Sequence, residues 1–120
     1  MPAPSDAATR PAWAERERAD LVQVADEHLV SVLAAMAGDA ARAHQDQARA
    51  VEALVADQAR VLVVQATGWG KSAVYWAATS AIRALGGGPT LVVSPLLALM
   101  RDQLTAAERA GLRADRKSVV

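Results

Sequence analysis

The residues best suited to chemistry stand together between two apolar runs, in the stretch QATGWGKS at 65–72. Gly68 and Gly70 tolerate backbone conformations that a Cβ would forbid, so several N–H groups can point into one concavity. Lys71 adds a flexible cation, and Ser72 adds a hydroxyl where a helical pattern begins. Free N–H groups and the helix dipole favour anions at that place. The stretch therefore predicts a site for the phosphates of a nucleotide.

Each residue of this loop has an expected role. Lys71 would reach the β and γ phosphates, and the Ser72 hydroxyl would take one coordination position on Mg²⁺. The common pattern G-x-x-x-x-G-K-[ST] wants glycine where this chain has Gln65, so the loop is the variant A-x-G-x-G-K-S. Trp69 either packs on a neighbouring domain or nucleic acid, or is an exposed ring. The expected contacts are Thr67, Gly68, Trp69, Gly70, Lys71 and Ser72; the alternative is a turn that only joins a strand to a helix.

Apolar periodicity predicts the elements that would hold this loop. Residues 14–36 carry apolar side chains at helical spacing, on the face formed by Leu21, Val24, Ala25, His28, Leu29, Val32, Leu33 and Met36. The packing of this helix on the following domain is the simplest reading, and a partner-binding or DNA-binding helix is the alternative. Three further helices are expected at 45–56, 72–85 and 96–110.

Two short valine-rich runs, VLVVQ at 61–65 and TLVVSP at 90–95, are typical of strands buried on both faces of a parallel sheet. Their alternation with helices predicts an α/β fold, a parallel sheet with flanking helices, preceded by a helical N-terminal segment. The expected division is a flexible N-terminus at 1–12, a helical segment at 13–38, the α/β domain at 39–115 and a tail at 116–120.

Composition limits the class of protein. The chain has 120 residues, 52% of them hydrophobic, which fits one small globular domain. It has no cysteine, and two histidines, His28 and His44, cannot build a metal site alone; both are expected at the surface. Because the net charge is zero, overall charge gives no reason to expect nucleic-acid binding. Without a long apolar run, a soluble cytoplasmic protein with no membrane partner is expected.

The segment SPLLALMRDQ, 94–103, narrows the function further. Ser94 and Pro95 would stand at the carboxyl end of a parallel strand, where a hydroxyl and free helix N–H groups can bind a backbone phosphate of nucleic acid. The alternative is that Ser94 caps a helix whose leucines are core. Together with ATGWGKS, the segment resembles RecQ-like DNA helicases of superfamily 2, of the DEAD/DEAH-box type. The resemblance assigns nucleic-acid contacts to Ser94, Pro95, Leu96, Arg101 and Gln103.

The resemblance implies a RecA-like P-loop domain that uses ATP and Mg²⁺ in 3′–5′ unwinding of single-stranded or forked DNA. It also implies a glutamine before the loop that recognises adenine, because an amide offers a donor and an acceptor together. Gln47 is the choice, since Val51 and Leu54 then fall at the family's apolar positions.

The resemblance covers about residues 40–114 and stops before the D-E-x-H motif and the second domain that hydrolysis requires. A truncated chain is therefore expected, one that binds ATP without hydrolysing it or unwinding DNA, and that is poorly soluble because its sheet edges are exposed. Two other readings stay open: a different P-loop ATPase or small kinase, and a non-enzymatic module that kept the loop for its fold.

Overall fold

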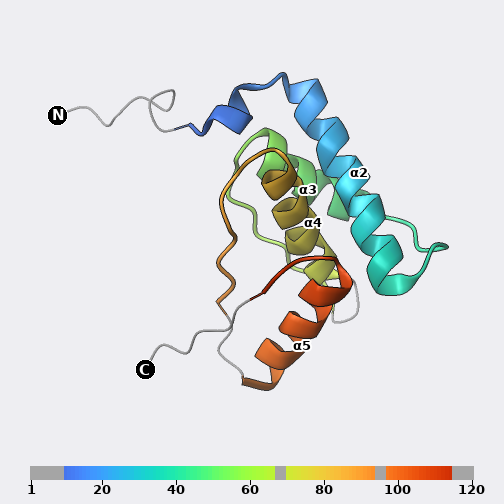
Figure 1. Ribbon diagram of the computed structural model, residues 1–120. Coiled ribbons are helices and arrows are strands. Elements are labelled where there is room, and N and C mark those ends of the chain that lie inside the picture. Colours follow the sequence, from blue (N-terminus) through green and yellow to red (C-terminus); the bar gives the residue numbers. More distant parts are fainter. Residues whose placement is uncertain (1–9, 67–69, 94–96, 115–120) are drawn as a thin grey trace.

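The computed structural model describes residues 10–66, 70–93 and 97–114, and of 97–100 it describes the backbone alone. Every regular element in these ranges is helical (Figure 1). A short 3-10 helix, η1, is followed by four α-helices; their bounds are Ala12–Glu15 for η1, Arg18–Ala37 for α2, Gln45–Ala56 for α3, Lys71–Ala84 for α4 and Leu97–Arg109 for α5. The four predicted helices are confirmed, and α3 has the predicted bounds.

Helix α2 forms because its apolar residues recur on one face. Leu21, Ala25 and Leu29 are almost fully buried, as are Val32 and Leu33 one turn further on. The helix ends at Gly38, whose φ of 94° lies in the region that favours glycine, and whose N–H donates to the Ala34 carbonyl at 3.0 Å. The other face of α2 is exposed, as expected of a helix that covers a core.

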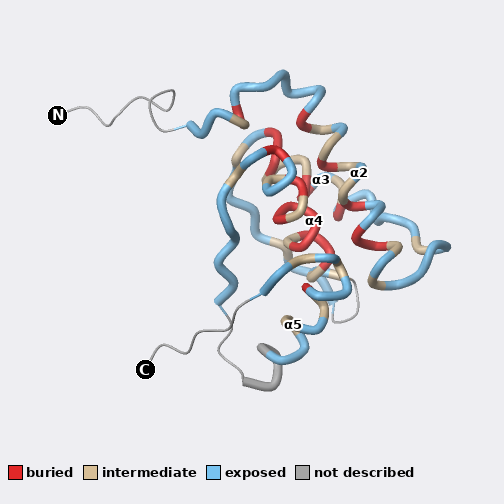
Figure 2. Tube along the Cα trace, viewed as in Figure 1, coloured by how far each residue is buried: buried red, intermediate tan, exposed pale blue. Residues whose placement is uncertain are grey.

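The core lies where α2, α3 and α4 pack on one another (Figure 2). Helix α3 contributes Val51 and Val55, both fully buried. Helix α4 contributes Trp76 and four buried alanines, Ala73, Ala77, Ala78 and Ala81. Of the described residues of α5, Ala107 alone is buried. No helix in the described ranges is both long and apolar enough to cross a bilayer.

Polar contacts join α2 to its neighbours at its start and its middle. Arg18 Nε and Nη2 donate to the two carboxylate oxygens of Asp57 at 2.8 and 3.1 Å, a bidentate ion pair between the start of α2 and the residue after α3. Both side chains are largely exposed, so the pair contributes little to stability. His28 is half-buried, not at the surface, and its Nδ1 lies 2.7 Å from Ser80 Oγ on α4.

The expected parallel sheet is wrong, because none of the described residues lies in a strand. Residues 61–66 and 90–93 are not helical, and in the described chain no backbone hydrogen bond joins the two segments. Leu62 and Leu91 are each 87% exposed. A strand gains its backbone partners and its buried faces from neighbouring elements. Here the helices bury one another, and of residues 61–64 only Val63 packs against the core.

Candidate functional site

The start of α4 has free backbone N–H groups next to a lysine. Gly70 is the N-cap, with a φ of 96°, and no side chain caps the helix. Within the part of the chain that the structure describes, the N–H groups of Lys71 and Ser72 have no acceptor, whereas the next one, of Ala73, donates to the Gly70 carbonyl at 3.1 Å. Free N–H groups at the positive end of a helix favour a bound anion.

The cation of the site folds back over the chain that leads into the loop. Lys71 is exposed, and its Nζ donates to the Gln65 carbonyl at 3.1 Å. In the described ranges no carboxylate pairs with this ammonium group. Because an exposed hydrogen bond of this kind is weak, a phosphate can draw Lys71 away from Gln65 at small cost. The residues therefore suit a phosphate group.

Ser72 is half-buried one position further along α4, and the Tyr75 hydroxyl lies beside it. The Tyr75 hydroxyl lies 3.2 Å from Ser72 Oγ and also within hydrogen-bond distance of Gln103 Oε1 on α5, and its single proton can be donated to one of these two acceptors at a time. A single hydroxyl ligand is sufficient for Mg²⁺ bound with a nucleotide, because this ion takes most of its ligands from water and phosphate oxygens.

Gln47 is buried beneath the loop, with 1% of its surface exposed. The backbone N–H of His44 donates to its Oε1 at 2.8 Å, and its Nε2 donates to the Gly70 carbonyl at 3.1 Å. A Cβ on Gly70 would lie 2.6 Å from this Nε2. The amide thus ties the start of α3 to the residue that opens α4. His44 is exposed and completes a capping box with Gln47.

The structure brings five of the predicted site residues into one region: Gln47, Gly70, Lys71, Ser72 and Gln103. Arg101 is exposed on α5. The remaining predicted contacts lie outside the described residues; they are Thr67, Gly68, Trp69, Ser94, Pro95 and Leu96.

Sequence reasoning missed Tyr75, although the signal was present. Tyr75 follows Ser72 by three residues in a segment with a helical pattern, and side chains at that spacing share one helix face. It also missed the contact between Gln47 and the loop. That contact joins residues 23 apart in the sequence, and no local pattern indicates it.

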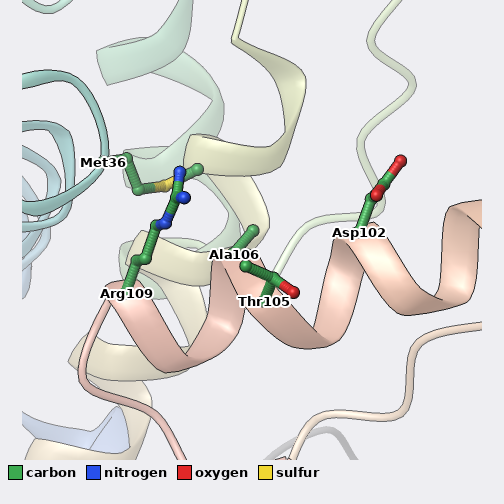
Figure 3. Close-up of a pocket in the computed structure, with 5 residues that line it drawn as sticks. All are labelled: Met36, Asp102, Thr105, Ala106 and Arg109. Atoms are coloured by element: carbon green, nitrogen blue, oxygen red, sulfur yellow. The ribbon is translucent and has the colours of Figure 1, made fainter.

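A separate cleft of about 310 Å³ lies between the end of α2 and α5, lined by Met36, Asp102, Thr105, Ala106 and Arg109 (Figure 3). Arg109 reaches toward Met36, while Asp102 lies away from both, nearer the start of α5. The cleft contains none of the residues predicted to bind nucleotide or nucleic acid.

A family model described as DEAD/DEAH box helicase matches residues 44–119, more than half of the chain. The match begins at His44, the N-cap of α3, and includes Gln47, the glycine loop, α4 and α5. Comparisons with curated proteins and with solved structures gave no match.

Proposed function

Because the chain belongs to the DEAD/DEAH box helicase family, we propose that it carries the ATP-binding part of a RecQ-like helicase that couples ATP hydrolysis to 3′–5′ unwinding of DNA. The family is ATP-dependent and acts on nucleic acid. The finer, RecQ-like assignment is supported by two stretches of sequence, ATGWGKS at 66–72 and SPLLALMRDQ at 94–103.

The observation that carries the proposal is the start of α4. An uncapped helix N-terminus, an exposed ammonium group and a hydroxyl converge there within two residues, Lys71 and Ser72. On binding, Lys71 would leave the Gln65 carbonyl for the β and γ phosphates of ATP, and the free N–H groups would donate to phosphate oxygens. Ser72 Oγ would bind Mg²⁺. Gln47 would act beside the loop, and Thr67, Gly68 and Trp69 would complete it.

Nucleic acid would be bound along the segment that leads into α5. Ser94, Pro95 and Leu96 would present a hydroxyl and helix N–H groups to a backbone phosphate. Arg101 adds an exposed cation and Gln103 an amide on the same helix. Such contacts do not read the base sequence, so binding should weaken as salt rises.

The test of the proposal is the substitution Lys71→Ala. We expect it to weaken the binding of a fluorescent ATP analogue in the presence of Mg²⁺ by at least about tenfold, because a charged hydrogen-bonding partner contributes about 1.5–3 kcal/mol. Fluorescence titration measures this, and circular dichroism checks that the helices remain. Arg83→Ala is the control, since it removes a cation from the last turn of the same helix. Equal affinity of Lys71→Ala and the unmodified chain would contradict the proposed site.

The finer assignment is tested in the same titration format. A labelled single-stranded DNA bound to the chain is displaced by unlabelled DNA or by RNA of the same sequence. Stronger competition by DNA supports the RecQ-like assignment. Stronger competition by RNA would place the chain in another branch of the family and leave the ATP site intact.

A further inference from the structure

We propose that Tyr75 is a positioning residue that couples the nucleotide site to the nucleic-acid segment, because its hydroxyl contacts Ser72 on one side and Gln103 on the other. The inference rests on the proposed function, from which the roles of Ser72 and Gln103 come. Neither the loop pattern nor the segment SPLLALMRDQ includes Tyr75. It is the contact across α4 and α5 that brings it into the site.

The position of the Tyr75 hydroxyl is fixed by its surroundings. Its ring packs edge-on against Trp76, with ring centroids 4.8 Å apart and an interplanar angle of 70°. Trp76 is itself buried in the core, with 6% of its surface exposed. The hydroxyl therefore stands on a ring that the core holds in place, one helical turn beyond Ser72.

A single proton decides how the three groups are arranged. A phenol donates one hydrogen bond and accepts others, whereas a serine whose lone pair binds a metal ion must give its proton to an acceptor. If Ser72 Oγ held Mg²⁺, it would give its proton to the Tyr75 oxygen, and the Tyr75 proton would then be committed to Gln103 Oε1. In the structure the Tyr75 hydroxyl lies within hydrogen-bond distance of both Ser72 Oγ and Gln103 Oε1, so its one proton is shared between these two acceptors.

The sign of the coupling follows from the amide of Gln103. Tyr75 engages its carbonyl oxygen, which leaves the Nε2 donors for a phosphate oxygen of nucleic acid. Bound nucleotide therefore orients Gln103 for nucleic acid, and by reciprocity nucleic acid strengthens nucleotide binding.

The bridge has this influence because residues 101–109 of α5, whose side chains the structure describes, place a single residue in the core. Ala107 is its only buried residue among those described, while α2, α3 and α4 are packed on one another. An exchange of one hydrogen bond can shift the position of such a helix, whereas it would have little effect on an element held by many apolar contacts.

The experiment uses the whole chain and the variant Tyr75→Phe, which keeps the ring and removes the hydroxyl. The affinity for a fluorescent ATP analogue with Mg²⁺ is measured with and without a single-stranded DNA oligonucleotide. We expect DNA to tighten ATP binding to the unmodified chain by about threefold to tenfold, the size that a net hydrogen bond supports. In Tyr75→Phe this factor should fall to about one, while the affinity for ATP alone changes less than twofold.

Ser80→Ala is the matched control. Ser80 also carries a half-buried hydroxyl on α4, but it pairs with His28 on α2 and not with α5. It should leave the coupling factor unchanged, although the melting temperature falls.

The outcomes separate the two proposals. If ATP and DNA both bind and Tyr75→Phe retains the coupling, the role of Tyr75 is refuted and the proposed function stands. If the unmodified chain binds no ATP, both are refuted. The bridge is also tested without any ligand: thermal melts of Tyr75→Phe, Gln103→Leu and the double variant should be non-additive, and additive changes would show that no bridge exists.

Discussion

Replacing Gly70 with alanine puts a methyl group where the structure has no space for it. The new Cβ would lie 2.6 Å from Gln47 Nε2, a distance that the atoms cannot keep, and Gln47 is too deeply buried to turn away. The residue at position 70 must also keep a φ of 96°, a backbone conformation that residues other than glycine rarely adopt. Either the amide loses its bond to the Gly70 carbonyl or the start of α4 shifts.

The two costs can be estimated separately. Strain at a positive φ is worth about 1 kcal/mol or more. A buried amide group left without its partner costs about 1–3 kcal/mol more. Gly70→Ala should therefore lower the free energy of unfolding by about 2–4 kcal/mol, a large part of the 5–15 kcal/mol typical of a domain. Urea unfolding followed by circular dichroism at the helical band measures this.

Gly86 provides the control, because it has the same φ of 96° and a Cβ there would meet nothing within 4 Å. Gly86→Ala should cost only the strain, about 1 kcal/mol. The difference between the two variants isolates the contact with Gln47. If Gly70→Ala and Gly86→Ala destabilise the chain equally, Gln47 does not hold the loop and the reasoning is refuted.

Two further predictions concern charge and exposure. Burial and the neighbouring Asp26 carboxyl raise the pKa of Glu52. The Glu52 carboxyl therefore holds a proton more tightly in the folded chain than in the unfolded chain, so the free energy of unfolding falls as the pH rises from the unfolded pKa, about 4.3, through the raised pKa. Glu52→Gln should thus raise the melting temperature at pH 7 more than at pH 4; an equal shift at both pH values, or the same gain in the exposed control Glu108→Gln, would contradict this. Leu62→Thr and Val93→Thr should raise solubility, measured by light scattering at increasing concentration, with little change in melting temperature, since these side chains are 87% and 83% exposed. A loss of several degrees would show that they are buried in solution.

The helices could be predicted from the sequence because their signals are local. Apolar spacing marks the buried face of α2, and the glycine at position 38 marks its end. The bounds of α3, and those of α4 to within one residue, followed from the same kind of pattern. A helix forms its backbone hydrogen bonds within itself, so a continuous segment contains most of the information that decides it.

The strands were predicted wrongly because a strand, unlike a helix, takes its backbone hydrogen bonds from other segments of the chain. A short valine-rich run indicates a buried extended segment, but its hydrogen bonds must come from residues elsewhere. Residues 61–65 have the composition of a strand and no strand partner in the described chain. The candidate site shows both cases: Lys71 and Ser72 were predicted from adjacent residues, whereas the contacts of Gln47 and Tyr75 depend on how helices pack.

The unequal packing of α4 and α5 has a consequence for the time course of any ligand response. Local opening reactions in proteins span a range of free energies, from near zero for weakly held elements to the global value for the core. Lys71 and Ser72 belong to a helix of the core, and Gln103 belongs to the part of α5 with described side chains, residues 101–109, in which Ala107 alone is buried. The proposed nucleotide contacts Lys71 and Ser72 should therefore stay in place, while the proposed nucleic-acid contact Gln103 should move in and out of place many times for each unfolding of the whole chain.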